Sequence, residues 1–567
     1  MSAHLINISI GPVQPFIAAA RRTRDLWFGS RLLSEICMET ARSVKDSGGE
    51  LIFPQEDSLN VSDGVDPNVA NVILAELPDG DPAKVVSQAR EKALSVLKDY
   101  GDQVLGEYGE LVNRDLWDDQ IEQALEFFAV WVPYGSEDYL VARDKVGRLM
   151  GARKNCRDFV QLADPESRQI EKSSLDGRSE SVLKDRESVE ELLERNPMWK
   201  LRLRLKSTEA LDALGLIKRG GNPSVMRAKD EFPSVEHFAA KPWMDRVEKE
   251  APEEFRRLKK AQGEAGGISL SDVVFPFRIA QVQEETGRDL NAVKMALNGL
   301  VKRIGEPDPY LAVLKADGDK MGAAISSIKT PEGHRTFSSE LASFATKAHG
   351  IVGKHGGKCI YAGGDDVLAF LPLNSCLECA RELADAFNGS FVKSVVSDTP
   401  TLSVGIAVGH FLEPLEDLLK FADEAEAKAK GTDRNGLAVV VRSRGNAPIG
   451  FRKRWDSTVA DLTVDKRLRL WARLFDEEVI SSRFPYELRS MEGFYGNWKD
   501  QSSIKEAIPA DVFSVLGKKR SVGGDSKEVA DELKAIVETI TSVENLKELV
   551  SELLVARHLG PVMEVKS

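Results

Sequence analysis

Four aspartates stand in two short turns of this sequence. Asp317 and Asp319 follow an apolar segment, in ADGDKMG, and Asp365 and Asp366 lie between two apolar segments, in YAGGDDVLAF. Carboxylates that lie close together repel each other, and their pKa values rise unless a cation neutralises them. Ligand sets made only of oxygen atoms suit Mg²⁺ or Mn²⁺ rather than zinc. The pattern therefore predicts a two-metal site of the kind that stabilises the attacking and leaving oxygens in phosphoryl or nucleotidyl transfer.

The two glycines before the second pair have two interpretations. Gly363 and Gly364 let the backbone turn tightly and approach a ligand closely. Glycine and aspartate are also favourable turn residues, so this stretch alone fits an ordinary surface hairpin equally well. The other acidic turn, expected on a neighbouring strand, favours the metal site.

Basic residues cluster at the end of a predicted helix at 415–431. Lys428 and Lys430 lie near its last turn, and Arg434 lies just beyond it. A cation close to the metals could hold triphosphate oxygens. The spacing by itself is more typical of a solvated helix face with Glu and Lys, so both interpretations stay open.

The segments around the acidic turns alternate between strand-like and helical patterns. Their order is β-α-β-β-α-β with an added helix and strand, a ferredoxin-like layout in which helices cover one face of an antiparallel sheet. In this layout the strand before the first turn and the hairpin with the second turn are neighbours. The predicted strands are 311–316, 358–362, 367–373, 401–410 and 437–443, and the predicted helices are 338–356, 375–395 and 415–431.

The first part of the chain shows a similar order without acidic turns. LINISIGPVQPF at the start shares the shape of LAVLKADGDKMG: an apolar strand, a turn with glycine and then a helix. Superposing the two stretches puts Gly11 on Asp317 and Val13 on Asp319, so a first copy of the unit would have lost its acids. The predicted elements are a strand at 5–10, a helix at 16–44, strands near 50 and 71, and a helix-rich charged region at 82–130.

Composition and charge set broad limits. The chain has 567 residues, 42% of them hydrophobic and 29% charged, which is ordinary for globular domains. It contains no run of about 18 apolar residues that would predict a membrane span and no secretion signal at its start. Five cysteines in a chain of this length favour reduced thiols in the cytoplasm. The net charge of -13 argues against wrapping nucleic acid by charge alone, but allows a local basic patch or a partner subunit.

Several of these stretches together resemble one family. YAGGDDVLAFLP, LKADGDKMG, LSVGIAVGH and ADEAEAKAKGTDRNG are similar to the palm of GGDEF-type cyclases. The whole chain resembles the large, polymerase/cyclase-like subunit of type III CRISPR effector complexes, the type III-B form above all. ISIGPVQPFIAAARRTRDLWFGSRLLSE is similar to the first palm of that subunit, and GARKNCRDF (151–159) and DEFPSVEHFAA (230–240) fall where the family has similar stretches.

The resemblance implies an α+β fold with two ferredoxin-like palm domains that face each other, plus helical domains. Residues 165–235 are polar and broken, which is typical of a loop or linker, and 450–567 show amphipathic segments without a strong strand. We expect a degenerate first palm at 1–160, a helical and linker domain at 161–304, a second palm with the catalytic site at 305–447, and a C-terminal helical domain at 448–567.

The resemblance also implies an activity. Once the complex has recognised target RNA, two ATP molecules would meet between the palms. The 3′-hydroxyl of one would attack the α-phosphate of the other, and pyrophosphate would leave. Repetition and ring closure would give cyclic oligoadenylate, a second messenger in antiviral defence. The implied metal is Mg²⁺ or Mn²⁺, and the implied partners are the other effector subunits, guide crRNA and target RNA, with no membrane.

Site residues of the family carry over by position. Asp317, Gly318 and Asp365 would bind metal, and Asp366 would bind metal or help to deprotonate the 3′-hydroxyl. Asp319 would be a further ligand or would support the turn. The residues that would contact the nucleotide are Gly363, Gly364 and Lys430 from the second palm and Ser30 from the first.

In the first palm, the acceptor-nucleotide pocket has candidates in Arg24, Asp25, Trp27 and Ser30. Packing and salt bridges behind the first strand are an equal alternative for these residues. The stretch 320–328 holds no Asn of the kind that reads guanine in GGDEF enzymes, which is compatible with ATP.

Departures from the family pattern carry predictions of their own. The cysteines of the family's zinc site are replaced by Ser173, Asp176, Asp212 and Gly215, and we expect no structural zinc because such a site needs thiolates. The chain begins at the first palm and has no His-Asp dipeptide, so we expect no HD-type nuclease activity. We interpret Cys376 and Cys379 as half-buried thiols and the Gly-Gly-Asp at 523–525 as a turn.

Two alternatives to cyclic oligoadenylate synthesis stay open. The same palm chemistry could join ATP to a different small acceptor, because the degenerate palm would form the acceptor pocket. A scaffold subunit that only organises guide and target RNA would need no catalytic acids, and the intact aspartates at 317, 365 and 366 argue against it.

Overall fold

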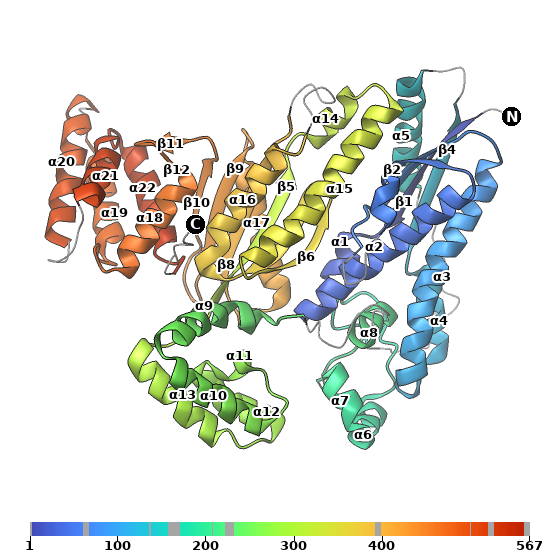
Figure 1. Ribbon diagram of the computed structural model, residues 1–567, viewed down its shortest axis with the longest axis horizontal. Coiled ribbons are helices and arrows are strands. Elements are labelled where there is room, and N and C mark those ends of the chain that lie inside the picture. The colour runs from blue at the N-terminus through green and yellow to red at the C-terminus, as the bar shows by residue number, and fades with distance from the viewer. Residues whose placement is uncertain are drawn as a thin grey trace.

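Two units, each a β-sheet with helices, stand next to each other, and further helices lie below them and at one end (Figure 1). The computed structural model describes residues 3–560 apart from 61–66, 135–137, 157–170, 207, 222–231, 392–398, 499–500 and 520–526. The Gly-Gly-Asp at 523–525 and parts of the stretches 151–159 and 230–240 lie outside the described residues.

The first sheet has four strands in the order β2-β3-β1-β4, each antiparallel to its neighbours. Alternate residues of β1 face opposite sides of the sheet. Ile6, Ile8 and Ile10 are buried with α2 and α3, whereas Leu5 is buried with α5. The strands are β1 (His4–Gly11), β2 (Glu50–Phe53), β3 (Val72–Leu77) and β4 (Glu126–Pro133), and the helices are α1 (Gln14–Ala18), α2 (Thr23–Asp46), α3 (Pro82–Tyr108), α4 (Arg114–Gln123) and α5 (Tyr139–Asn155).

Two details of this unit differ from the prediction. EFFAVWVP forms strand β4 at the end of the region expected to be helix-rich, because a short apolar run rich in aromatic and β-branched residues cannot be assigned from its pattern alone. The helix expected at 16–44 is interrupted between α1 and α2. Lys218 Nζ donates hydrogen bonds to the carbonyl oxygens of Phe16 (2.9 Å) and Ala19, and these contacts hold the end of α1.

The second sheet has six strands in the order β10-β9-β8-β5-β7-β6. Its first strand, β5 (Tyr310–Gly318), lies antiparallel to β7 (Asp366–Leu371) on one side and to β8 (Leu402–His410) on the other. The predicted order of strands and helices is confirmed, and with it the α+β fold. The other elements are β6 (Lys358–Gly363), β9 (Gly436–Arg442), β10 (Ile449–Arg454), α14 (Met321–Ser327), α15 (Pro331–Lys354), α16 (Cys376–Asn388) and α17 (Leu415–Lys430).

Strand β10 lies in the part of the chain expected to lack strong strands. It pairs with β9 and extends the palm sheet past residue 447, where the second palm was expected to end. Its sequence, IGFRKR, contains three basic residues and buries only Phe451, which is the pattern of a partly exposed edge strand. Such a strand lacks the continuous apolar run by which β5 and β8 are recognised.

The two palms share one topology and pack reciprocally. The order β2-β3-β1-β4 in the first corresponds to β6-β7-β5-β8 in the second. Helix α15 lies against β2, and α2 lies against β6. In the first contact, Arg335 Nε donates to the carbonyl oxygen of Leu51 (3.0 Å), and the N–H of Gln55 donates to Ser338 Oγ (3.0 Å). The internal duplication indicated by the sequence is therefore present in the fold.

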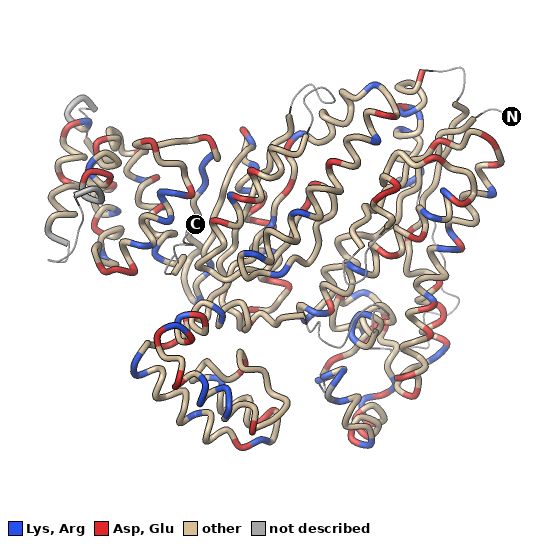
Figure 2. Tube along the Cα trace, in the orientation of Figure 1, with Lys and Arg blue, Asp and Glu red and all other residues tan. Residues whose placement is uncertain are grey.

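Helices join the two palms and follow the second. The region expected as a loop or linker at 165–235 includes α6, α7 and α8, and Asp185 and Asp212 cap the amino ends of α6 and α8. No helix among the described residues is long and apolar enough to cross a membrane. Acidic and basic positions are interspersed over the whole trace (Figure 2).

Along the sequence, the segment that joins the two palms forms α6 (Arg186–Arg195), α7 (Pro197–Leu203), α8 (Ala213–Gly220), α9 (Val235–Glu250), α10 (Pro252–Ala265), α11 (Leu270–Val273), α12 (Ile279–Thr286) and α13 (Asn291–Ile304). After β10 come β11 (Thr458–Val459), β12 (Leu462–Thr463), α18 (Val464–Asp476), α19 (Phe484–Tyr495), α20 (Gln501–Lys519), α21 (Lys527–Glu538) and α22 (Val543–Ala556). The four domain limits stay predictions.

Candidate active site

The two acidic turns meet at one end of the second sheet. Strands β5 and β7 pair as far as Ala316 and Val367, which are the residues next to Asp317 and Asp366. Asp365 lies against Gly318, because a Cβ atom at position 318 would be 2.7 Å from the Cβ atom of Asp365. Glycine at 318 therefore permits the close approach of the two turns. Three of the four aspartates singled out from the sequence thus come together.

Burial raises the pKa of two of these carboxyl groups. It raises the pKa of Asp365 to about 6, and the charge of Asp317 adds to the shift. It raises the pKa of Asp366 to about 8, helped by a hydrogen bond to Asp317 and by the charges of Asp365 and Asp317. Burial also acts to raise the pKa of Asp317, but hydrogen bonds from Asp366 and Lys430 hold it below its usual value. At neutral pH, Asp366 therefore stays protonated, and its O–H donates a hydrogen bond to Asp317.

Lys430 supplies the positive charge beside these acids. Its Nζ lies 2.7 Å from Oδ2 of Asp317 and 2.6 Å from Oε1 of Glu426. It is the last residue of α17, which packs on β5 and β8, so the end of the helix places the lysine over the end of β5. Lys428 lies elsewhere, against Gly450 of β10. Of the two lysines proposed from the sequence, only Lys430 joins the aspartates.

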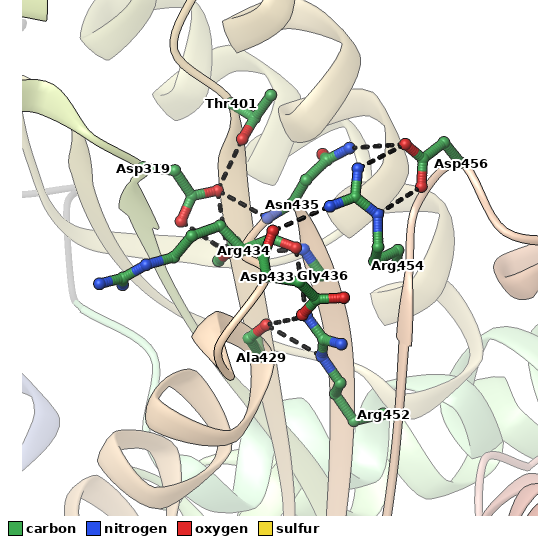
Figure 3. Close-up of polar contacts among 11 residues, drawn as sticks. Asp319, Thr401, Ala429, Asp433, Arg434, Asn435, Gly436, Arg452, Arg454 and Asp456 are labelled. Carbon is green, nitrogen blue, oxygen red and sulfur yellow. Dashed lines mark hydrogen bonds and ion pairs between the residues drawn. The ribbon is translucent and has the colours of Figure 1, made fainter.

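Asp319 supports the turn (Figure 3). Its buried carboxylate accepts hydrogen bonds from Thr401 Oγ1 (2.7 Å), Ser403 Oγ (2.8 Å) and the N–H of Asn435 (2.9 Å). Its own N–H donates to the carbonyl oxygen of Thr401 (2.7 Å). These contacts join the end of β5 to β8 and to the loop before β9. Of the two roles left open by the sequence, the structure favours the supporting one.

The loop held by Asp319 contains Arg434, the third basic candidate. Arg434 and Asn435 have φ angles of 59° and 49°. Arg452 Nη2 donates to the carbonyl oxygen of Arg434 (3.1 Å), and Arg454 Nη1 donates to that of Asp433 (2.8 Å). Figure 3 shows the side chain of Arg434 extending past Asp319, away from these bonds. The loop backbone is thereby fixed while the guanidinium group points away from it.

The aspartates have the chemistry of a divalent cation site. Asp317, Asp365 and Asp366 offer only oxygen atoms, and because burial disfavours the charged forms of Asp365 and Asp366, a positive partner would stabilise those forms. Within the described residues, no group of three or more His, Cys, Asp or Glu side chains is already arranged to hold a metal ion. In this conformation the ammonium of Lys430 and the proton on Asp366 neutralise the carboxylates instead.

Two residues of this site were not identified from the sequence. Lys315 stands two positions before Asp317, pairs with Asp423, and its charge acts to lower the pKa of Asp366. The alternation of strand side chains could have indicated it, since Lys315 and Asp317 must face the same side. Glu426, one helical turn before Lys430, could have been found by the i, i+4 spacing.

Three of the first-palm candidates have structural roles. The guanidinium of Arg24 donates to the carbonyl oxygens of Arg219 (3.0 Å) and Gly221 (2.9 Å) at the end of α8. Asp25 is buried and forms an ion pair with Arg219 Nε at 2.6 Å. Trp27 stacks on Phe232, with the ring centroids 5.7 Å apart. These contacts favour the packing alternative for the three residues.

Ser30 occupies a position that is repeated in the second palm. It is buried seven residues after the start of α2 (30 minus 23), as Ser338 is seven residues after the start of α15 (338 minus 331). Ser338 Oγ accepts a hydrogen bond from Gln55, just beyond β2. Helix α2 lies against β6 in the same way as α15 lies against β2. By this symmetry we expect Ser30 to lie beside the hairpin that follows β6. Its contact with a nucleotide stays a prediction.

Polar groups bind one another where the family's zinc site would be. Ser173 Oγ donates to Oδ1 of Asp212 (2.7 Å), and the N–H of Gly215 donates to Oδ2 of the same residue (3.3 Å). Asp176 instead accepts a hydrogen bond from the N–H of Arg178 (2.9 Å). The expected lack of zinc stays a prediction.

The thiols of the CxxC pair are more buried than expected. Cys376 and Cys379 are both 0% exposed. Burial raises the pKa of Cys376 to about 12 and raises that of Cys379 well above its usual value. Because a metal or redox role needs a thiolate, the pair acts as packing in the core.

Two family models match separate parts of the chain. Residues 5–102 match the model described as CRISPR-associated protein Cmr2, N-terminal. Residues 310–438, which contain the aspartates and Lys430, match the model described as Cas10/Cmr2, second palm domain. The chain is thus similar to Cas10/Cmr2 proteins in its N-terminal part and in its second palm. The expected resemblance to the large subunit of type III-B complexes is confirmed.

The similarity to relatives extends over most of the chain. The CRISPR system Cmr subunit Cmr2 of Pyrococcus furiosus is 27% identical, over 94% of this chain and 70% of the relative. A cryo-EM structure of type III-B Cmr-beta in the apo state has a TM-score of 0.65 at 15% identity, covering 96% of this chain and 82% of that chain. Cmr-beta bound to cognate target RNA has a TM-score of 0.64 at 14% identity, covering 96% and 83%. At such identities the solved structures show a shared fold.

Proposed function

We propose that this chain is a nucleotidyltransferase that converts ATP to cyclic oligoadenylate when its effector complex has bound target RNA. The observation that carries the proposal is the meeting of Asp317, Asp365 and Asp366 with Lys430 at one end of the second palm. An oxygen-only acidic cluster beside a lysine suits the binding of a metal-associated triphosphate.

The two glycines of the hairpin in the second palm border open space. A Cβ atom placed at Gly363 or Gly364 would meet nothing within 4 Å. The backbone between β6 and β7 is therefore open to a ligand on the side where side chains would otherwise stand. This openness supports the assignment of both glycines to nucleotide binding.

Each side chain has a part in the reaction. A bond forms between the 3′-oxygen of one ATP and the α-phosphorus of the other, and the bond from that phosphorus to pyrophosphate breaks. Lys430 would contact phosphate oxygens. Asp366 would bind metal or, in its ionised form, help to take the proton of the 3′-hydroxyl. Mg²⁺ or Mn²⁺ held by Asp317, Gly318, Asp365 and Asp366 would supply further positive charge to the triphosphate.

The proposal includes partners and location. The curated relative is named as a subunit of a CRISPR Cmr system, and the Cmr-beta structure is described as bound to cognate target RNA. We infer from these relatives that the chain works with other type III-B subunits, guide crRNA and target RNA. The cytoplasm is the proposed compartment, with all five cysteines free.

The test is product analysis with the complex assembled on target RNA. Labelled ATP with Mg²⁺ or Mn²⁺ should give cyclic oligoadenylate, and Asp365→Ala and Asp366→Ala should abolish it. A mixed adduct of ATP and another molecule would replace the proposal by transfer to a different acceptor. Unreacted ATP in an intact, target-loaded complex would leave only a scaffold role.

A further inference from the structure

Helix α14 starts directly after the turn that contains Asp317 and Gly318. The side chain of Met321, its first residue, packs against that turn, because a Cβ atom at position 318 would lie 2.9 Å from it. A helix of seven residues is marginal on its own in water, and among these seven, all of them described, Ala324 alone is buried. The direction of α14, and with it one side of the turn, therefore depends on bonds to other elements.

His334 of α15 binds the carboxyl end of α14. It is 0% exposed, and its Nε2 lies 2.9 Å from the carbonyl oxygen of Ile325. The N–H of Ile328 points to the same oxygen from 3.4 Å. Because a carbonyl oxygen only accepts, Nε2 must carry the hydrogen. His334 thus makes the shorter of these two hydrogen bonds to the end of the helix.

The other ring nitrogen of His334 binds the first palm. Nδ1 lies 2.9 Å from the hydroxyl oxygen of Tyr139, the first residue of α5. Burial lowers the pKa of His334, which fits a neutral ring whose hydrogen is on Nε2. Nδ1 therefore accepts, and the O–H of Tyr139 donates. The rings of Tyr139 and Phe53 also contact His334 in T-shaped geometry, with centroids 5.5 and 5.8 Å away, so the imidazole is fixed in place.

The two palms have other bonds at this place. Arg335 Nη2 pairs with Oε2 of Glu76 at 2.5 Å, and its Nε donates to the carbonyl oxygen of Leu51 (3.0 Å). These bonds join α15 to β3 and β2, whereas the bond made by His334 continues to α14. In Figure 1, one end of α15 lies between α14 and α5. The hydroxyl of Tyr139 thus adds a connection to α14 in an interface that Arg335 already holds.

We propose that Tyr139 and His334 are positioning residues for the reaction at the second palm. Through their hydrogen bonds, the first palm holds the end of α14 and so keeps the turn at Asp317 and Gly318 directed at the acidic hairpin. The inference rests on the proposed function, and neither residue is assigned a contact with metal or nucleotide. The alternative is a buried histidine that only packs, in which case the hydroxyl of Tyr139 would affect stability alone.

Tyr139→Phe removes the hydroxyl and keeps the ring. In the target-loaded complex it should lower kcat about tenfold, because the turn is less often in the reactive geometry. The KM for ATP should stay within about twofold of wild type, because the groups that bind ATP are unchanged. Tyr100→Phe is the matched control. Tyr100 of α3 lies in the same palm, is 5% exposed like Tyr139, and donates to Oε2 of Glu35 (2.8 Å), so its variant should keep the wild-type kcat.

Two amide variants separate the two bonds of His334. The side chain of His334→Gln can reproduce the donor at Nε2 but not the acceptor at Nδ1, and His334→Asn can reproduce the acceptor but not the donor. Both should lower kcat as Tyr139→Phe does, because each interrupts the connection from α5 to α14. The double variant Tyr139→Phe with His334→Gln should lose no more than either single variant, because both changes remove the same bond.

Amide hydrogen exchange of the full chain measures α14 without any reaction. The N–H groups of Ala323 and Ala324 both donate to the carbonyl oxygen of Lys320 (3.0 Å), and their exchange reports the opening of the helix. Tyr139→Phe should speed this exchange about fivefold, and Tyr100→Phe should leave it unchanged.

The outcomes separate this inference from the proposed function. Unchanged exchange in α14, or a wild-type kcat for Tyr139→Phe in an active complex, would reject the inference alone. Equal losses of kcat in Tyr139→Phe and Tyr100→Phe, or additive losses in the double variant, would reject it as well. Faster exchange of α14 in Tyr139→Phe, combined with a wild-type complex that makes no product on target RNA, would reject the proposed function and leave the connection to α14 in place.

Discussion

The ammonium of Lys430 lies 2.7 Å from Oδ2 of Asp317, so the last residue of α17 is bound to the end of β5. Together with the hydrogen bond from Asp366, this contact keeps the pKa of Asp317 below its usual value, while burial raises the pKa of Asp365 and Asp366. The site therefore combines Asp317, which stays ionised, with Asp366, which is mainly protonated at neutral pH, and Asp365 has an intermediate pKa of about 6.

Lys430→Met should lower kcat/KM for ATP by about 10²-fold, because it removes one positive charge from the triphosphate and the ion-pair partner of Asp317. Steady-state kinetics of the target-loaded complex measure the effect. Lys428→Met is the matched control, since Lys428 lies against Gly450 rather than the aspartates, and it should stay within about twofold of wild type. Equal losses in the two variants would contradict the role of Lys430.

Asp366 should make the metal-free chain less stable as pH rises. Its pKa is about 8 in the folded chain, against an ordinary value of 3.8 for an aspartate. The protonated form is the one that folding favours, so its contribution to the free energy of unfolding is complete below pH 3.8 and is lost as pH rises towards 8. In EDTA, Asp366→Asn should therefore melt at a higher temperature than wild type at pH 8.5, with a smaller difference at pH 5.

Asp365→Asn is the control for that measurement. The pKa of Asp365 is raised only to about 6, so its neutral replacement should stabilise the chain less than Asp366→Asn does. A melting temperature of the Asp366→Asn variant that falls below wild type at pH 8.5 would contradict the raised pKa.

Asp319→Ala should destabilise the second palm, because it leaves Thr401, Ser403 and Asn435 without their buried acceptor. The loss should be about 3 kcal/mol, visible as a lower melting temperature of the transition that includes this palm. Asp319→Asn keeps one acceptor oxygen and should recover part of the loss. If Asp319→Ala lost activity with no change in melting, Asp319 would be a ligand rather than a support.

Gly318→Ala should separate the two acidic turns. Its new Cβ would lie 2.7 Å from the Cβ atom of Asp365 and 2.9 Å from the side chain of Met321, so the hairpin must move. We expect a loss of nucleotide transfer of more than tenfold with near-native secondary structure, measured by product formation and circular dichroism. Gly322→Ala, where a Cβ would meet nothing within 4 Å, is the control and should retain activity.

The strand pattern of the second palm could be predicted because apolar runs flank both acidic turns. The apolar runs that form β5 and β7 are continuous, and each adjoins an acidic turn. That these two strands are neighbours in the sheet follows from the ferredoxin-like order. The shared site of Asp317, Asp365 and Asp366 follows from that order as well. The family resemblance implied that two palms face each other, whereas the residues themselves indicated a second palm only by the similar shape of two short stretches.

The role of Asp319 could not be predicted, because it depends on Thr401, Ser403 and Asn435, which are distant in sequence and carry no pattern of their own. Arg24, Asp25 and Trp27 were ambiguous for the same reason, since their partners lie in α8 and beyond. Strand β10 was not predicted because its sequence is largely charged and Phe451 is its single buried residue, so it shows no apolar run. In each case the deciding contact is between distant segments.

Manganese binding is the most direct test of the central claim, that Asp317 and Asp365 hold a divalent cation under a triphosphate. Mn²⁺ bound to the full chain with a non-hydrolysable ATP analogue can be counted by electron paramagnetic resonance. We predict binding by the wild type, a loss of at least tenfold in affinity in Asp317→Asn and Asp365→Asn, and little change in Asp79→Asn, a loop residue outside the site. Wild-type affinity in both site variants would contradict the account.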